Sequence, residues 1–183
     1  MIYIALLRGV NVGSKNTLKM KDLVEAFEKQ KFKDVRSYIQ SGNIIFGFKN
    51  IATKKLEENI ESLINSNFGI TVNAIIRTEY ELEMIIKQNP FIKVTGLDIE
   101  KLHVTFLSDE VNKKLIPALD VLKDKNERFS VHDKEVFLYC PNGYGRTKLN
   151  NTNLEKKLKT TGTTRNWNTT KKLLEIAKSK YTR

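Results

Sequence analysis

Three arginines in loops rich in glycine and asparagine are the side chains best suited to bind a ligand. They are Arg8 in R-G-V-N-V-G-S-K-N, Arg146 in N-G-Y-G-R-T-K and Arg165 in R-N-W-N-T. Only seven of the 32 basic residues are arginine. A guanidinium forms two parallel hydrogen bonds with a carboxylate or phosphate, which a lysine cannot do. Arginine in these loops therefore indicates anion binding.

The positive charge is concentrated at the C-terminal end of the sequence. Residues 141–183 contain 11 Lys/Arg and two Asp/Glu, a net charge of +9. Residues 1–140 contain 21 Lys/Arg and 19 Asp/Glu, a net charge of +2. Such an asymmetry suits a polyanion-binding surface, although lysines that only solvate helix faces would give the same count.

The loop from Arg8 to Asn16 follows an apolar run and precedes a helical pattern. Free N–H groups at a helix start bind anions, and Arg8, Asn11, Gly13 and Lys15 are candidate ligand-binding residues. The loop matches neither the phosphate-binding nor the dinucleotide-binding glycine motif. Asparagine side chains that bond to their own backbone are the structural alternative.

Two C-terminal loops hold the other candidates. In the first, Asn142 and Gly143 precede Arg146 and Lys148, which project to the same side of an extended loop. In the second, Arg165 precedes a helix whose N-cap is Asn166 or Asn168. Trp167 lies at helical spacing from Leu174, Ala177 and Tyr181, which favours core packing over base stacking.

Candidates for catalysis are few. His103 and His132 are the only histidines, and neither has a neighbour at metal-ligand spacing. His103 could act as a general base, but it also fits a surface or interface histidine. Cys140 is in phase with apolar residues, and Ser41 lacks the strand-to-helix turn of a hydrolase nucleophile. The sequence predicts no metal site and no cofactor.

The first half of the chain has the order β-α-β-β-α-β. Apolar spacing predicts strands at 2–7, 35–40, 44–48 and 70–77, with helices at 19–31 and from Leu56 to about Asn67. Ser41-Gly42-Asn43 is a hairpin turn, and Gly69 offers a left-handed helix cap. This order is typical of the ferredoxin-like fold. Both faces of strand 2–7 are apolar, so the sequence predicts a covered sheet and argues against an open RNA-binding sheet.

The second half repeats most of this pattern. A helix at 79–89 ends before Pro90. Strand 102–107 is followed by Ser108 as N-cap, a helix at 109–123 interrupted by Pro117, and a hairpin formed by 127–131 and 135–140. Helices near 151–159 and 167–181 complete the order β-α-β-β-α-α.

We therefore predict an α+β fold of two ferredoxin-like-related halves, with mixed or antiparallel sheets. The expected domains are 1–89 with its linking helix, a linker at 90–100, and 101–183 with basic C-terminal helices.

The composition also bounds the setting of the protein. No apolar run approaches the length of about 18 residues that a membrane span needs. The single cysteine suits a reducing compartment. The expected location is the cytoplasm, with no membrane partner. The sequence does not decide the oligomeric state.

Four motifs resemble a known family, the bacterial domain-of-unknown-function 1697 family. They are A-L-L-R-G-V-N-V-G (5–13), Y-I-Q-S-G-N-I-I-F (38–46), P-N-G-Y-G-R-T-K-L (141–149) and R-N-W-N-T (165–169). The resemblance extends from residue 1 to about 178. It implies a soluble bacterial protein with two ferredoxin-like halves, and no established activity comes with it. The residues that coincide with the family pattern are Arg8, Gly9, Asn11, Gly13, Ser41, Gly42, Asn43, Asn142, Gly143, Gly145, Arg146, Lys148, Arg165, Asn166, Trp167 and Asn168.

Three functional hypotheses follow. The first is a binding module for nucleic acid or a phosphorylated small molecule. The second is an enzyme acting on a small phosphorylated or carboxylated substrate between the two halves, with His103 as base. The third is a structural role in which the motif residues lock the halves together.

Overall fold

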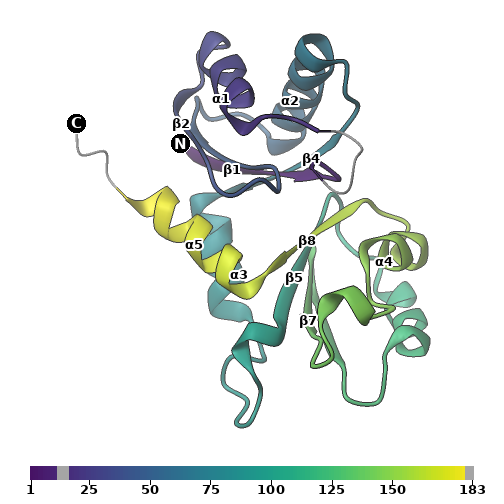
Figure 1. Cartoon of the computed structure of the whole chain (residues 1–183). Coiled ribbons are helices and arrows are strands. Elements are labelled where there is room, and N and C mark those ends of the chain that lie inside the picture. The colour runs from purple at the N-terminus through teal and green to yellow at the C-terminus, as the bar shows by residue number, and fades with distance from the viewer. Residues whose placement is uncertain (12–16, 180–183) are drawn as a thin grey trace. The chain divides into compact units, whose positions relative to one another are not determined.

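The computed structural model describes residues 1–11 and 17–179 (Figure 1). Two compact units divide the chain. The first contains Met1–Glu83 and the C-terminal segment that starts at Lys172, and the second is Met84–Lys171. These boundaries differ from the expected 1–89, 90–100 and 101–183, because the division falls inside two helices and assigns the chain's end to the first unit. Independent folding of each unit stays a prediction.

The first unit has the predicted β-α-β-β-α-β order. Its elements are β1 (Ile2–Arg8), α1 (Met20–Lys29), β2 (Lys33–Ser37), β3 (Asn43–Gly47), α2 (Thr53–Phe68) and β4 (Asn73–Thr78), followed by α3 (Glu79–Gln88). The antiparallel sheet has the order β2-β3-β1-β4. This arrangement confirms the ferredoxin-like expectation. Gly69 caps α2 in the left-handed conformation, with φ of 66°.

Helices α1 and α2 cover one face of this sheet (Figure 1). Tyr3, Ala5 and Leu7 of β1 are buried there with Leu23 and Phe27 of α1. The alternate β1 residues, Ile4 and Leu6, are fully buried too. Burial on both sides of β1 confirms what its continuous apolar run predicts.

The second unit repeats the strand order. Its elements are the 3-10 helix η1 (Ile99–Lys101), β5 (Leu102–Leu107), the 3-10 helix η2 (Lys113–Leu122), β6 (Arg128–His132), β7 (Glu135–Tyr139), η3 (Tyr144–Arg146), α4 (Asn151–Leu158) and β8 (Gly162–Asn166). Helix α5 (Trp167–Lys178) follows β8. The antiparallel sheet has the order β6-β7-β5-β8. The same topology in both units supports a duplication.

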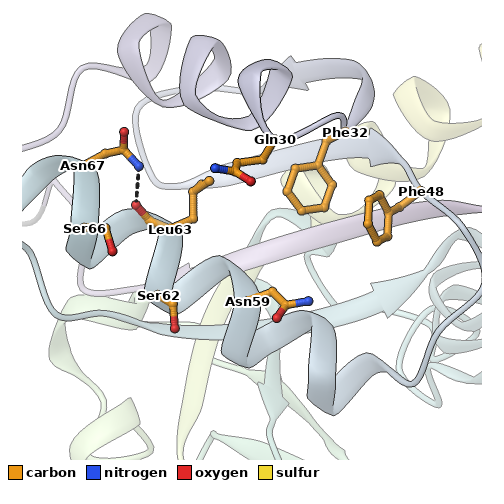
Figure 2. Close-up of a pocket in the computed structure, with 8 residues that line it drawn as sticks. All are labelled: Gln30, Phe32, Phe48, Asn59, Ser62, Leu63, Ser66 and Asn67. Atoms are coloured by element: carbon orange, nitrogen blue, oxygen red, sulfur yellow. Dashed lines mark hydrogen bonds between the residues drawn. The ribbon is translucent and has the colours of Figure 1, made fainter.

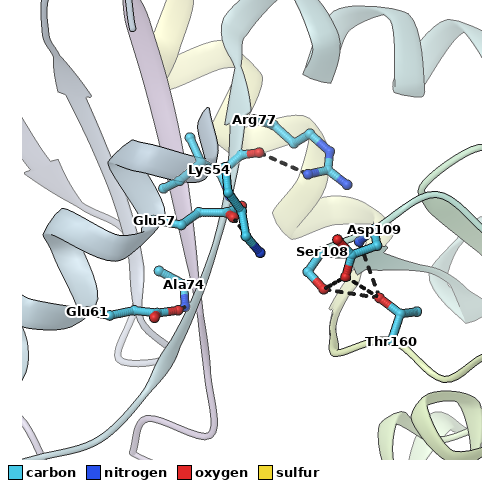
Figure 3. A network of polar contacts seen from close by, with 9 residues as sticks. Lys54, Glu57, Glu61, Ala74, Arg77, Ser108, Asp109 and Thr160 are labelled. Atoms are coloured by element: carbon cyan, nitrogen blue, oxygen red, sulfur yellow. Dashed lines mark hydrogen bonds and ion pairs between the residues drawn. The ribbon is translucent and has the colours of Figure 1, made fainter. Parts of the chain in front are cut away.

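Two predictions in the second half are wrong. The expected order lacks a fourth strand, but Gly162–Asn166 forms β8 and pairs with β5. The expected helix at 109–123 is instead the shorter 3-10 helix η2, which contains Pro117. Its N-cap is Asn112, whose side chain accepts from Lys114 N–H at 3.0 Å. Ser108 is not the N-cap, because its hydroxyl bonds to Asp109 and Thr160 (Figure 3).

Matching contacts connect the outer strand of each sheet to a helix glutamate. Glu61 in α2 accepts from the Ala74 N–H of β4 at 2.9 Å (Figure 3). Glu155 in α4 accepts from the Gly162 N–H of β8 at 2.9 Å. An edge strand has unpaired N–H groups that must find acceptors or water. A helix glutamate that accepts from an edge-strand N–H in both sheets is a further sign of duplication.

A buried arginine also occurs at matching positions. Arg77 is paired with Ile4 across β4 and β1, and Arg165 is paired with Val104 across β8 and β5. In each case Nη1 donates to the carbonyl of the preceding residue at 2.9 Å. Arg165 is thus the second copy of a fold feature.

Candidate functional site

The loop after β7 is fixed by its own backbone hydrogen bonds and by two buried side chains. Gly143 has φ of 91°, a conformation that L residues with a side chain rarely adopt. Its N–H donates to the Cys140 carbonyl, and Arg146 N–H donates in turn to the Gly143 carbonyl. Thr147 and Leu149 are buried, so they anchor the loop to the second unit.

The exposed residues of this loop are the predicted ones. Asn142, Arg146 and Lys148 are exposed. Arg146 and Lys148 make no side-chain hydrogen bond or ion pair with any residue in the described ranges. Because these two cations have no ion pair to give up when an anion binds, they are suited to bind one.

Arg146 and Lys148 line a groove of about 250 Å³ together with the end of η2. Its third cation is Lys123, which lies 3.5 Å from Asp120 and over the Phe129 ring. Two carboxylates, Asp124 and Glu127, also line it. Because Lys123 is already paired with Asp120, Arg146 and Lys148 are the cations of this groove that have no ion-pair partner among the described residues.

Glu127 belongs to the scaffold of this groove. It is buried, and its Oε2 accepts from the Asp124 N–H at 3.0 Å, which closes the turn before β6. Burial, together with the Glu127 carboxylate and against a hydrogen bond from Thr147, raises the pKa of the neighbouring Cys140 thiol to about 12. A thiol held in its neutral form is a poor nucleophile, so Cys140 is a packing residue.

Arg165 lies in a strand and is only 8% exposed. Its Nη1 donates to Thr163 Oγ1 at 2.7 Å and to the Thr164 carbonyl at 2.9 Å. Burial lowers the pKa of Arg165 to about 10, while the nearby Tyr144 raises it. The guanidinium therefore stays charged at neutral pH and is hydrogen-bonded within β8.

Asn166 and Trp167 begin α5 in the predicted way. The Asn166 side chain accepts from the Thr169 N–H at 2.7 Å, which identifies Asn166 as the helix cap. Trp167 is 3% exposed, so its assignment to the core is confirmed.

A network of hydroxyl groups lies on the α4-covered face of the second sheet. Tyr144 donates to Thr164 Oγ1 at 2.9 Å, and Thr105 Oγ1 lies 2.7 Å from the same oxygen. Thr164 donates to Asn151 Oδ1 at 2.6 Å. Thr164 Oγ1 then uses its one proton and both lone pairs. Thr164 had no signal in the sequence because β8 was missed, whereas Thr105 and Asn151 lie in predicted elements that only the fold brings to Thr164.

His103 stacks on the Tyr144 ring, with ring centroids 5.0 Å apart. Its Nδ1 lies 3.2 Å from the Lys101 carbonyl. Burial lowers the pKa of His103, the hydrogen bond with Lys101 raises it, and the Lys101 charge lowers it. His103 lies on the same face as the buried Leu107, Val136 and Leu138. His103 therefore lies on a face of the sheet that carries core residues.

The N-terminal loop contributes its predicted residues to the first unit. Arg8 is half-buried at the end of β1 and paired with Asn73 in the strand register. The Asn11 side chain donates to the Leu18 carbonyl and accepts from the Leu18 N–H, and it also donates to the Gln40 carbonyl in the turn before β3. The two bonds with Leu18 are of the local kind that the structural alternative describes. Gly13 and Lys15 lie outside the described residues.

The described residues contain no group of three or more His, Cys, Asp or Glu side chains that could hold a metal ion. Among the same residues, no helix is long and apolar enough to cross a membrane.

Comparisons with known proteins place the chain in a family. The family model described as "Protein of unknown function (DUF1697)" matches residues 1–137, and the chain belongs to this family. The matched region contains the motifs at 5–13 and 38–46 and ends before those at 141–149 and 165–169. No curated protein matches the chain.

A solved structure shares the fold. It is described as that of the conserved bacterial protein SP0830 from Streptococcus pneumoniae, and it is 22% identical in sequence. The alignment covers 97% of this chain and 98% of that chain, with a TM-score of 0.76. At this identity the likeness establishes the two-unit α+β fold.

Proposed function

We propose that the protein binds an anionic ligand, nucleic acid or a phosphorylated small molecule, through the groove of Lys123, Arg146 and Lys148. The observation that supports this most is the exposure of Arg146 and Lys148 on a rigid loop without a partner among the described residues. Asn142 and Gly143 precede them in the same loop and would shape the approach. Residues 141–171, which belong to the same unit as the groove, carry seven Lys/Arg against Glu155, and this charge favours a polymer.

The remaining predicted residues have different parts in this proposal. Arg165 and Asn166 would support the second unit through their hydrogen bonds inside β8 and α5. Arg8, Asn11, Gly13 and Lys15 belong to the first unit's sequence, and we propose no contact of theirs with the groove. We propose a cytoplasmic location on the basis of the single cysteine.

Fluorescence anisotropy with labelled single- and double-stranded oligonucleotides tests the proposal. Binding should weaken steeply as salt rises, because each neutralised phosphate releases counterions. The double variant Arg146→Ala, Lys148→Ala should bind less tightly and reduce the salt slope by about one to two units.

The matched control removes the same charge elsewhere. Lys113 and Lys114 are exposed on the same unit, and their double alanine variant should bind almost as the wild type does. An equal loss in both variants would mean that only net charge matters and would reject this groove. If no oligonucleotide binds at low salt, calorimetry with inorganic phosphate tests the small-ligand form of the proposal.

Catalysis is the second candidate function. The stacked His103 has a lowered pKa and would be neutral at pH 7, as a general base must be. Hydrolysis of p-nitrophenyl phosphate that disappears in His103→Gln would support an enzyme. A rate equal in the wild type and the variant would remove His103 from consideration.

A further inference from the structure

Two adjoining pockets in the first unit have opposite chemical characters. The first, here called the ring-and-amide pocket, has a volume of about 430 Å³ and lies between the end of α1 and α2. Figure 2 shows Phe32 and Phe48 side by side at one end and Asn67 at the other, with Gln30 and Asn59 between. None of its eight lining residues is charged, in a chain with 29% charged residues.

The aromatic end of this pocket is built by the way α1 ends. Phe32 N–H donates to the Phe27 carbonyl and Lys31 N–H donates to the Glu28 carbonyl. This pair of hydrogen bonds is that of a Schellman motif. The Phe27 and Phe32 rings pack with centroids 5.0 Å apart. Phe32 in turn contacts Phe48 at 4.7 Å. Phe48 is only half-buried, so a fixed aromatic surface remains for a planar ligand.

The amides of this pocket are available to a ligand. Gln30 and Asn59 are exposed, and neither side chain bonds to another residue in the described part of the chain. A carboxamide pairs its donor and acceptor with the complementary edge of a nucleobase. Single-stranded bases are recognised in this way, stacked on aromatic rings and hydrogen-bonded along their edges.

The second pocket, here called the lysine groove, has a volume of about 650 Å³ and shares Gln30 and Phe48 with the first. Its cationic side chains are Lys31, Lys33 and Lys49, against one carboxylate, Asp34. All three lysines are exposed and form no ion pair with a described residue. Lys49 Nζ lies over the Phe48 ring, 5.9 Å from its centroid, so a positive charge stands directly beside the aromatic surface.

We propose that the first unit binds a nucleotide across these two pockets, with the base on Phe48 beside Gln30 and Asn59 and the phosphate among the three lysines. A neutral pocket with a ring and paired amides matches a base, and an adjacent cationic groove matches its phosphate. The nucleotide is either free or a unit of a single strand. This site is separate from the Arg146 groove, and it does not depend on the function proposed there.

Nuclear magnetic resonance titration of the full-length protein with AMP tests the proposal. Amide shifts should change around residues 30–33, 48–49 and 59–67. Adenosine lacks the phosphate and ribose 5-phosphate lacks the base, so each should bind at least about fivefold more weakly than AMP. Equal binding of ribose 5-phosphate would overturn the base site, and equal binding of adenosine would overturn the lysine groove.

Variants assign the effect to these residues. Phe48→Leu keeps an apolar side chain but removes the ring, and Asn59→Ala changes an exposed residue that folding does not need. Each should weaken AMP binding about fivefold or more. The pair Lys31→Ala, Lys33→Ala should weaken it similarly, while the control Lys113→Ala, Lys114→Ala should not. Unchanged affinity in both Phe48→Leu and Asn59→Ala would overturn the site.

Two further comparisons separate the outcomes. A single-stranded octamer that binds at least tenfold more tightly than AMP indicates a polymer ligand, whereas equal affinity indicates a free nucleotide. Arg146→Ala, Lys148→Ala should leave the AMP-induced shifts in the first unit unchanged. Loss of those shifts in this variant, or no shifts with AMP and the octamer at millimolar concentration, would contradict the proposal.

Discussion

Burial separates the arginines that the sequence analysis groups together. Arg146 is exposed at the end of η3, whereas Arg165 is 8% exposed and hydrogen-bonded within β8. Sequence context could not separate them, because each follows or precedes glycine- and asparagine-rich residues. The difference comes from strand pairing of Arg165 with Val104, a residue 61 positions away.

Replacing the two arginines should therefore affect stability differently. Arg165→Ala removes hydrogen bonds to Thr163 and the Thr164 carbonyl from a buried site, so the free energy of unfolding should fall by about 2–4 kcal/mol. Arg146→Ala, at an exposed position, should change it by less than about 0.5 kcal/mol. Urea unfolding followed by circular dichroism measures both. Similar losses would contradict the distinction drawn from burial.

His103 should make stability depend on pH. Burial lowers its pKa, so the native state binds a proton at lower pH than the unfolded chain does. As pH falls from 7 through the ordinary histidine value near 6.5, the unfolded state is protonated first, and the free energy of unfolding decreases. His103→Phe, which keeps a ring against Tyr144, should show a smaller decrease between pH 7 and pH 5. Unfolding curves at these two pH values decide it, and equal decreases would contradict the prediction.

At the scale of elements, apolar periodicity predicts those parts of the fold that bury apolar faces. It finds β1, whose residues from Tyr3 to Leu7 are buried, and α2, which ends at Gly69. It misses β8 because Gly-Thr-Thr-Arg-Asn has no apolar side chain and is held by backbone pairing with β5. It overstates η2 because Pro117 has no N–H to continue an α-helix.

The candidate groove is predictable only in part for the same reason. Arg146 and Lys148 stand out in their own loop, but Lys123 and Glu127 come from a segment some 20 residues earlier. Only the fold brings that segment to the loop. The charge and spacing of residues within the Arg146 loop do not indicate that Lys123 and Glu127 lie beside it. The ring-and-amide pocket is hidden likewise, since its residues come from the segment after α1, from the residue after β3, and from α2.

The two glutamates that bind the edge strands offer a test of the duplication. Glu155→Ala should leave the Gly162 N–H without its acceptor and lower the free energy of unfolding by about 1–2 kcal/mol. Hydrogen exchange at the Gly162 amide should accelerate, and Glu61→Ala should have the same effect at Ala74. The conservative variants Glu155→Gln and Glu61→Gln keep an acceptor and should retain most of the protection. Protected amides in both alanine variants would show that these contacts add nothing.

At the scale of the whole molecule, the units differ in how the chain builds them. The second unit is one continuous segment, Met84–Lys171, whereas the first also uses the segment that begins at Lys172. In that returning segment Ser179 accepts from Arg36 at 2.7 Å, and Lys178 pairs with Glu83 at 2.7 Å. A fragment that ends near residue 90 would therefore lack Lys178 and Ser179, which contact Glu83 and Arg36 of the same unit.

The fragment 84–171 should fold by itself, because it contains all four strands of its sheet and the apolar cluster beneath α4. A chain of this length can bury enough surface for independent stability. Its nuclear magnetic resonance spectrum should show dispersed amide signals and slow exchange in β5 and β7. The matched control, 84–161, lacks β8 and with it the Thr164 hydroxyl that joins Thr105, Tyr144 and Asn151. This shorter fragment should be largely unfolded, since β5 would lose the whole of its pairing on one side. A 84–171 fragment as disordered as the control would mean that the second unit needs the rest of the chain in order to fold.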